Sequence, residues 1–269
     1  MRFLVLLFVL PLFGQPVLYH GGRVIVEPVN VYFLWYGDWG GNTATAILPE
    51  FVAALSHSDY FKINATYQDA GGNKATAGVN FVAAAEDRYS RGRDLDGNDV
   101  EAMIAAKLQA GDLPQDDHGV YFVLLSSDVR IYGFCSLYCG YHGYTPSGIK
   151  YALIGNPEAC PKACIGPTKI SPNHNPGADF MASAIAHELS ETITDPYLDA
   201  WYDELGQENA DKCLWQYGWP LRVGPGEMDW ANIKLGDRNY FIQKNWVNEG
   251  AGYCGLKIGA KGDPVLPPL

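Results

Sequence analysis

The sequence predicts a single α/β layered domain with a mixed sheet, a long helix that carries a metal-binding motif, and an irregular, disulfide-bonded C-terminal part. Strand-like and helix-like patterns alternate along the first part of the 269-residue chain. The longest helical pattern covers residues 178–194 and contains the pentapeptide HELSE. Beyond it the chain is rich in aromatic residues and glycine and has few periodic segments.

Charge and the N-terminal segment limit the expected partners and location. The formal net charge is −11 and no run of lysine and arginine occurs, so nucleic acid is not expected as a partner. Residues 1–15 join one basic residue to an apolar run too short to span a bilayer, which is typical of a secretory signal peptide. No other stretch is apolar for long enough to predict a membrane span. We therefore predict a secreted protein with a signal peptide over 1–15, one domain over 16–260 and a Pro-rich tail over 261–269.

The N-terminal part of the domain begins with strand patterns. Residues 23–29 and 30–36 are rich in β-branched and aromatic residues, and the second run is a buried strand stopped by Gly37. Apolar residues at helical spacing then predict a helix over 45–60, and residues 61–67 are a predicted second strand.

The middle of the chain continues the alternation. Asn98 or Asp99 is placed to cap a helix over residues 100–110. The runs VYFVLL, at 120–125, and GIKYALI, at 148–154, are predicted strands. After the motif helix, a strand or hairpin arm is expected over 240–246. Five aromatic residues in this last part are predicted to lie in the core, with stacking on sugar rings as the alternative: Trp201, Tyr202, Trp215, Tyr217 and Trp219.

Six cysteines fit the oxidising compartment that a secreted protein meets. Their two C-x3-C pairs are compatible with a structural zinc, but secretion favours disulfides. The preferred pairing joins Cys135 to Cys139, Cys160 to Cys164, and Cys213 to Cys254. His142, in the glycine-rich loop predicted over 133–143, is either a pocket residue near the site or a hydrogen-bonded loop histidine, and the second interpretation is preferred.

The pentapeptide HELSE predicts a metal site. On a helix, His187 and Glu191 project from one face, with Glu188 beside them. In the zinc-protease pattern H-E-x-x-H the residues at i and i+4 bind the metal and the Glu between them is the base. Glutamate replaces the second histidine here and is itself a competent zinc ligand. In the alternative without metal, both glutamates are solvated and His187 packs at the helix surface.

A catalytic zinc needs a third protein ligand and an open position for water. The candidates are Asp195, Asp203, Glu208 and Asp211. We favour Glu208, with Asp211 either a ligand or an acceptor that orients His187. Zn²⁺ is the expected ion, and because carboxylates also suit harder ions, Ca²⁺ or Mn²⁺ is the alternative.

This set of residues predicts a metal-dependent hydrolase, peptidase-like, in which Glu188 takes a proton from metal-activated water and the substrate is a peptide or a cell-wall polymer. The order of elements, with a sheet before the motif helix and further ligands after it, resembles the catalytic domains of zinc proteases, the zincins.

Five segments resemble the phosphate-induced protein 1 family, also called EXORDIUM-like: NVYFLWYGDW, VLLSSDV, GFCSLYCGYHG, KYALIGNP-x2-CP-x2-C and ITDP. The resemblance runs from about residue 29 to 254. It implies an extracellular or cell-wall protein, linked in plants to growth and cell expansion, and brings no established activity. At least some plant members have a segment resembling LAGTVTNP where this chain has AHELSETITDP, so they lack the His and Glu pair. The alternative function is therefore a non-catalytic extracellular binding protein that contacts cell-wall carbohydrate and holds a structural ion or none.

Overall fold

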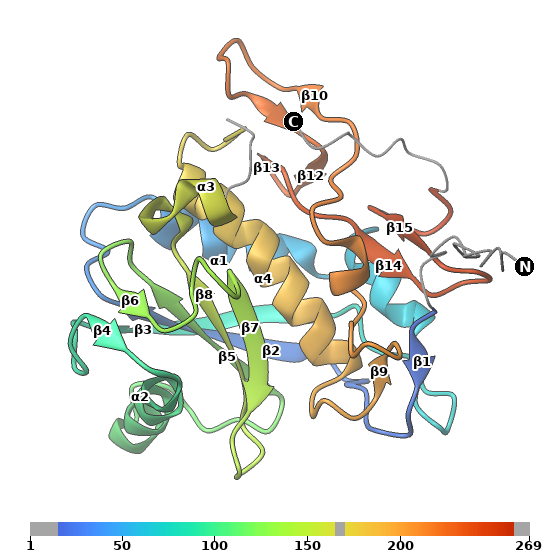
Figure 1. The fold of residues 1–269 in the computed structure, drawn as a ribbon, viewed down its shortest axis with the longest axis horizontal. Coiled ribbons are helices and arrows are strands. Elements are labelled where there is room, and N and C mark those ends of the chain that lie inside the picture. Colours follow the sequence, from blue (N-terminus) through green and yellow to red (C-terminus); the bar gives the residue numbers. More distant parts are fainter. Residues whose placement is uncertain (1–15, 165–169, 261–269) are drawn as a thin grey trace, which may run out of the picture.

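A computed structural model describes residues 16–164 and 170–260, so the predicted signal peptide and Pro-rich tail lie outside the described residues. Its centre is a five-stranded mixed sheet in the order β3-β2-β5-β8-β7 (Figure 1). Four strands are parallel and β7 is an antiparallel edge strand. The bounds are β2 (Val29–Tyr36), β3 (Val79–Asp87), β5 (Gly119–Leu125), β7 (Gly140–Tyr144) and β8 (Lys150–Gly155). The predicted mixed sheet is confirmed.

Three longer helices flank this sheet: α1 (Ala44–Leu55), α2 (Gly97–Ala110) and α4 (Pro176–Thr194). Alternate residues of a strand point to opposite faces. In β2, Val31 and Phe33 join the apolar cluster that contains α1 and α4. Tyr32 and Leu34 join a second cluster with α2. The sheet is therefore covered on both faces, as parallel strands require.

The ends of α2 and α4 follow from local chemistry. Asp96 caps α2 by accepting a hydrogen bond from Asn98 N at 2.8 Å, while the Asp99 carboxylate accepts one from Asp96 N at 2.9 Å. The predicted start at Asn98 or Asp99 is thus slightly late, because the capping pair begins at Asp96. Helix α4 ends at Asp195, since the residue before a proline disfavours helix.

Three predicted elements in the N-terminal part differ from the structure. The helix expected to reach residue 60 ends at Leu55. The predicted strand over 61–67 is a 3₁₀ helix, η1 (Phe61–Thr66), whose Phe61 and Ile63 are buried. Such a short apolar run does not distinguish a strand from a helical turn. The strand predicted over 23–29 is wrong, because residues 23–28 form no strand and β2 begins only at Val29.

The rest of the chain supplies short elements. The strand predicted over 240–246 is divided between two short strands, β13 (Arg238–Tyr240) and β14 (Asn245–Val247). Paired short strands are β1 (Leu18–Tyr19) with β9 (Trp201–Tyr202), β4 (Asp94–Leu95) with β6 (Arg130–Ile131), β10 (Leu221–Arg222) with β11 (Trp230–Ala231), β12 (Ile233–Leu235) with β13 (Arg238–Tyr240), and β14 (Asn245–Val247) with β15 (Tyr253–Gly255). Short helices are η2 (Pro157–Ala159), α3 (Pro161–Cys164) and η3 (Asp211–Cys213). The irregular C-terminal part is confirmed.

All six cysteines form disulfides, but two of the three predicted pairs are wrong. The bonds join Cys135 to Cys160, Cys139 to Cys164, and Cys213 to Cys254. The first two have the same sequence separation, 25 residues, because the two C-x3-C segments lie side by side and pair first with first and second with second. These bonds tie the loop before β7 to the segment after β8.

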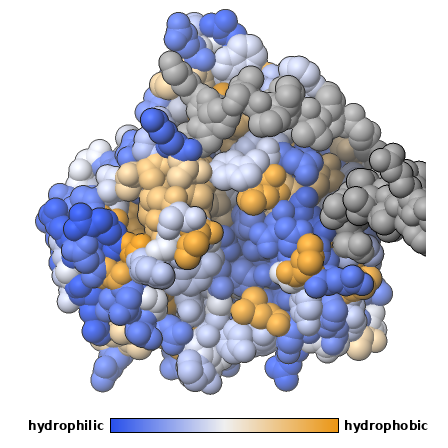
Figure 2. All heavy atoms as spheres, viewed as in Figure 1, coloured by the Kyte–Doolittle hydropathy of each residue, from blue (hydrophilic) through white to orange (hydrophobic). Residues whose placement is uncertain are grey.

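Neither the described helices nor the face of the molecule in Figure 2 has an extended apolar region. None of the described helices is long and apolar enough to cross a bilayer. In Figure 2 the most hydrophobic residues lie scattered among hydrophilic ones. Single exposed apolar side chains of this kind are ordinary on a folded protein.

Candidate metal centre

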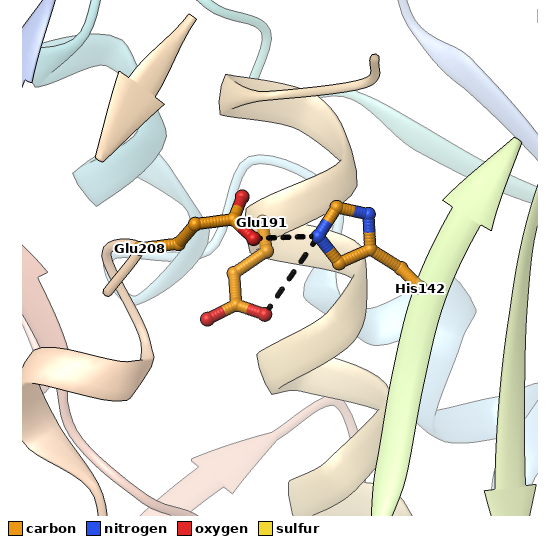
Figure 3. A group of neighbouring side chains, drawn as sticks. All are labelled: His142, Glu191 and Glu208. Carbon is orange, nitrogen blue, oxygen red and sulfur yellow. Dashed lines mark hydrogen bonds and ion pairs between the residues drawn. The ribbon is translucent and has the colours of Figure 1, made fainter. Parts of the chain in front are cut away.

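The candidate centre lies where three segments meet. Helix α4 carries His187, Glu188 and Glu191. The neighbouring edge strand β7 carries His142, and the chain after β9 carries Glu208 and Asp211. The side chains of His142, Glu191 and Glu208 point toward one another in Figure 3. The structure thus brings the favoured site residues together with His142, for which the sequence favoured a loop position.

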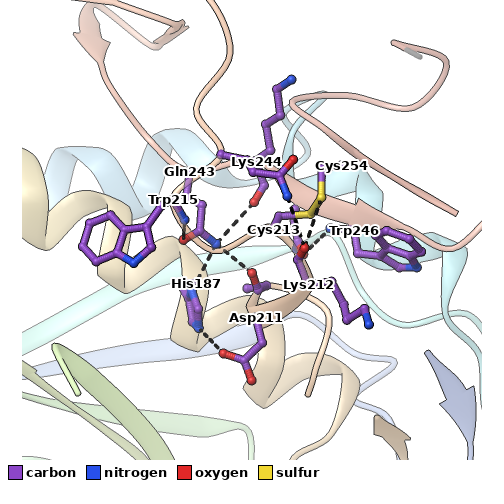
Figure 4. Close-up of a disulfide and its surroundings, with 12 residues drawn as sticks. His187, Asp211, Lys212, Cys213, Trp215, Gln243, Lys244, Trp246 and Cys254 are labelled. Atoms are coloured by element: carbon purple, nitrogen blue, oxygen red, sulfur yellow. Dashed lines mark hydrogen bonds and ion pairs between the residues drawn. A yellow bond between two sulfur atoms is a disulfide. The ribbon is translucent and has the colours of Figure 1, made fainter. Parts of the chain in front are cut away.

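The first half of the cluster surrounds His187. Its Nε2 is 3.1 Å from Glu191 Oε1 and 3.4 Å from Asp211 Oδ1 (Figure 4 shows the contact with Asp211). Glu191 Oε1 also accepts a hydrogen bond from Asp211 N at 3.1 Å. Asp211 therefore approaches Nε2 of His187, the same ring nitrogen as Glu191, and not Nδ1. A carboxylate beside Nε2 is placed like a metal ligand, whereas one that only orients the ring would contact Nδ1.

Gln243 occupies the opposite side of the His187 ring. Its Nε2 is 3.2 Å from His187 Nδ1 and donates to Ala210 O at 2.8 Å, while its Oε1 accepts from Trp215 N (Figure 4). A histidine that binds metal through Nε2 carries its proton on Nδ1. Ion binding at His187 Nε2 therefore requires Gln243 to turn its amide oxygen toward Nδ1.

The second half of the cluster surrounds His142. Its Nε2 is 2.9 Å from Glu208 Oε2 and 4.0 Å from Glu191 Oε2 (Figure 3). The favoured third ligand, Glu208, thus contacts the ring of His142 instead of the ring of His187. The preference for a loop histidine at His142 is corrected, because the residue lies in β7 and its side chain is only 4% exposed. The sequence signal for this position is a histidine on an edge strand beside the motif helix.

The two remaining ligand candidates have structural partners. Asp195 Oδ1 accepts hydrogen bonds from Asp199 N and Ala200 N, both at 2.7 Å, and so closes the end of α4. Asp203 lies 2.5 Å from Lys212 Nζ in a buried ion pair. Neither carboxylate contacts the histidines through a hydrogen bond in the described part of the chain.

Burial and mutual charge perturb the whole cluster. Burial lowers the pKa of His142, but the hydrogen bond and charge of Glu208 outweigh it and raise the pKa to about 9. His187 behaves alike: burial lowers its pKa, while Glu191 and Asp211 raise it well above the ordinary value. Burial raises the pKa of Glu188 and of Glu208 above that of an ordinary carboxyl. Buried carboxylates of this kind favour either a proton or a cation.

The donor chemistry fits a divalent ion. Imidazole nitrogen and carboxylate oxygen are the donors that zinc binds, and carboxylates also suit harder divalent ions. Glu208 Oε1 is buried and has no hydrogen-bond partner among the described residues, so it is available as a ligand. Two groups of three are close enough to hold an ion: His142 with Glu191 and Glu208, and His187 with Glu188 and Glu191.

A cavity of about 330 Å³ adjoins the cluster. His187, Glu188 and Asp211 line it together with the disulfide-bonded segment 135–140. A Cβ on Gly140 would lie only 2.9 Å from Glu188 Oε1, so glycine there leaves room for the carboxylate. Aromatic and apolar side chains form much of the remaining wall: Leu137, Tyr138, Phe180, Leu214, Trp215 and Tyr217.

The aromatic cluster predicted for the core is therefore only partly buried. Trp215 is 42% exposed at the cavity, and Trp219 is 59% exposed. Trp201, Tyr202 and Tyr217 are half-buried. The predicted core position is wrong for the two exposed tryptophans, one of which lines the cavity instead.

Comparison with known proteins gives one family. The family model described as "Phosphate-induced protein 1 conserved region" matches residues 17–227. Protein EXORDIUM-like 3 of Arabidopsis thaliana is 31% identical over 233 residues, which cover 74% of this chain and 69% of that protein. Protein EXORDIUM-like 5 of the same plant is 30% identical over 234 residues, covering 74% of this chain and 64% of that protein. Protein PHOSPHATE-INDUCED 1 of Nicotiana tabacum is 25% identical over 232 residues, covering 75% and 70%. No solved structure matches this chain.

The family match covers β7, α4 and the segment after β9, which are the three parts that build the candidate centre. It also covers five of the six cysteines, including the four that form the two bonds between the C-x3-C segments. The resemblance seen in the sequence motifs is thereby confirmed: the chain belongs to the phosphate-induced protein 1 family.

Proposed function

We propose that this chain is an extracellular metal-dependent hydrolase, peptidase-like, in which His187, Glu191 and Asp211 hold a divalent ion and Glu188 is the general base. The observation that carries the proposal is a buried cluster of imidazoles and carboxylates from three segments, which reaches the wall of one cavity through His187, Glu188 and Asp211. Three disulfides support an extracellular location, since such bonds persist in oxidising compartments.

The distances around His187 suit one ion. Zinc bonds of about 2.0–2.1 Å in tetrahedral geometry place neighbouring ligand atoms roughly 3.3 Å apart. The separation of His187 Nε2 from Glu191 Oε1, 3.1 Å, is close to that value. Asp211 Oδ1 lies 3.4 Å from the same nitrogen, although Asp211 is not in the group of three formed by His187, Glu188 and Glu191. Glu208 supports the site from the His142 side, at 2.9 Å from that ring. Zn²⁺ is the expected ion, with Ca²⁺ or Mn²⁺ as alternatives.

The chemistry divides between the ion and Glu188. A catalytic zinc lowers the pKa of water to about 7 and polarises a carbonyl. Glu188 lines the cavity beside His187, where its carboxylate can accept a proton from water. It removes a proton from water as the oxygen bonds to the carbonyl carbon. It then returns that proton to the amide nitrogen as the carbon–nitrogen bond breaks.

The surroundings support a peptide substrate. Strand β7 is an antiparallel edge strand next to α4, and an edge strand can add an extended peptide through main-chain hydrogen bonds. A sheet followed by a motif helix, with an edge strand beside it, is the zincin-like feature of the proposal. Phe180 and Trp215 offer an apolar wall for a substrate side chain.

A second candidate is a non-catalytic extracellular binding protein whose cluster holds a structural ion. The family match favours it, because the names of the matched relatives state no enzymatic activity. The exposed Trp215 at the cavity also suits stacking on a sugar ring, as in binding to cell-wall carbohydrate.

Two variants separate these candidates. Elemental analysis of the purified protein should find a divalent metal that His187→Ala loses in whole or in part. Glu188→Gln should keep the metal and lower hydrolysis of a peptide library by about 10²–10⁴-fold. A wild type that holds metal, cleaves no peptide and binds cell-wall polysaccharide equally well as Glu188→Gln would establish the second candidate. A wild type without metal would end the hydrolase proposal.

A further inference from the structure

Glu191 lies between two histidines that come from different elements. Its Oε1 is 3.1 Å from Nε2 of His187, which is on the same helix. Its Oε2 is 4.0 Å from Nε2 of His142, which is on β7 (Figure 3). Each carboxylate oxygen therefore faces a different imidazole. A carboxylate in this position can hold one ion on each oxygen.

The ligand atoms separate into two sets that share Glu191. One set is His142, Glu191 and Glu208, and the other is His187, Glu188 and Glu191, with the atoms of each set within 4.8 Å of one another. Glu188 is the base of the proposed function, so His187 and Glu191 are the ligands that the second set supplies. Among the described residues no set contains both histidines. Ligands of a single zinc lie within about 4 Å of one another, given bonds of about 2.0–2.1 Å. The arrangement therefore corresponds to two ion positions rather than one.

The second position has donors that the first does not use. The His142 side chain is 4% exposed and the Glu208 side chain 11% exposed. Glu208 Oε2 lies 2.9 Å from the His142 ring, and Glu208 Oε1 is buried with no hydrogen-bond partner in the described part of the chain. A buried carboxylate oxygen without a donor is costly unless a cation satisfies it.

Charge points the same way. Glu191 and Glu208 are buried carboxylates beside imidazoles that must be neutral to bind metal. Each buried carboxylate needs a cation or a proton, and a second divalent ion beside His142 would supply the cation at Glu208.

We propose that the centre is dinuclear, with Glu191 bridging an ion held at His187 and a second divalent ion held by His142 and Glu208. The second position takes Zn²⁺ or Mn²⁺, because it combines one imidazole with carboxylate oxygens. Paired ions in hydrolytic enzymes lie about 3.5–4 Å apart and clamp both the attacking and the leaving atoms. This inference rests on the metal site of the proposed function and adds a position to it.

The test is metal stoichiometry of the full secreted protein, measured by elemental analysis after dialysis against Zn²⁺. We expect two equivalents in the wild type, one in His142→Ala and one in Glu208→Gln, with folding of each variant checked by circular dichroism. His118→Ala is the matched control, because this histidine is exposed and lies outside the centre, and it should retain two. In Mn²⁺-loaded wild type, electron paramagnetic resonance should show a coupled pair that His142→Ala converts to an isolated ion.

Other outcomes would overturn the dinuclear centre and distinguish its failure from that of the proposed function. One equivalent in both wild type and His142→Ala, lost in His187→Ala, leaves a single ion at His187 and removes the second position. One equivalent that His142→Ala abolishes makes His142 a ligand of the only ion. No metal in the wild type would end both proposals.

Discussion

The two longest helices lie on opposite faces of the sheet and differ in what they bury. Helix α2 buries Val100, Met103 and Ile104, a single apolar stripe. Helix α4 buries all its residues except Pro176, Phe180 and His187. Its buried residues include both glutamates of the motif as well as several serines and threonines.

This difference separates packing from function. The stripe on α2 is what an amphipathic helix needs to cover one face of a sheet. A helix buried all round has no such need for carboxylates, and burying them costs free energy unless they are paired. Glu191 of α4 is stabilised by His142 of β7 and by the backbone N–H of Asp211 in the chain after β9, and these partners belong to the candidate site.

The free energy of unfolding should fall most when the buried ion pair next to Asp211 is broken. Lys212 Nζ lies 2.5 Å from Asp203 Oδ2, and the two side chains are 6% and 0% exposed. Lys212→Met leaves a buried carboxylate without its partner, which should lower the free energy of unfolding by about 3–5 kcal/mol. Urea denaturation measures the loss.

The control for this variant lies on the α2 side of the sheet. Arg130 pairs with Asp94 at 2.7 Å, but the side chains are 80% and 71% exposed. Because water and salt screen such pairs, Arg130→Met should leave the unfolding midpoint unchanged. Equal losses in the two variants would contradict the contrast between the two sides.

Metal removal should act on one helix only. At a free ion concentration of 100 times the dissociation constant, binding stabilises the folded state by about 2.7 kcal/mol. A chelator should remove this contribution and speed amide hydrogen exchange along α4, while exchange along α2 stays unchanged. Hydrogen exchange with mass spectrometry follows both helices in one sample. Equal acceleration in both would show that the ion stabilises the fold as a whole.

The pH dependence of stability provides a smaller test. Burial alone would raise the pKa of Asp203, but hydrogen bonds from Lys212, Gln207 and Leu205 outweigh it and lower the pKa below 3.8. A carboxyl with a depressed folded pKa stabilises the protein above its unfolded pKa, and this stabilisation is lost as the pH falls through the folded pKa. Each unit of depression corresponds to about 1.4 kcal/mol. The stability difference between wild type and Asp203→Asn should therefore be constant near neutral pH and shrink below about pH 4. A stability difference that grows on acidification would contradict the lowered pKa of Asp203.

Much of the fold could be predicted from local pattern, and the misses have physical causes. Strands β2, β5 and β8 are continuous apolar runs, because both of their faces are covered. Strand β3 escaped prediction because its VNFVAAAED sequence is rich in alanine, a weak strand former, and alternates between half-buried and exposed positions at the sheet edge.

Local pattern also predicts part of the candidate metal centre. His187 and Glu191 are four residues apart on one helix, so a local period brings them together. His142 reaches them only because β7 pairs antiparallel with β8 beside α4, a long-range contact that no local spacing encodes. The disulfides between the C-x3-C segments depend on the same packing, so the spacing alone favoured the wrong partners.

Removing a helix cap should lower the free energy of unfolding only slightly, and the loss should differ between α2 and α4. In α2, Asp96→Ala removes an acceptor for Asn98 N and should cost about 1 kcal/mol, with metal content unchanged. In α4, Asn175 accepts from Ala178 N at 3.0 Å and also donates to Asn42 Oδ1 at 2.8 Å and to Thr43 Oγ1 at 2.9 Å. Asn175→Ala therefore loses the cap together with two links to the start of α1, and its cost should exceed that of Asp96→Ala. Both costs are measured by urea denaturation. If the two variants lost equal stability, the links to α1 would contribute nothing, and α4 would be held by its buried face and its partners at the metal centre.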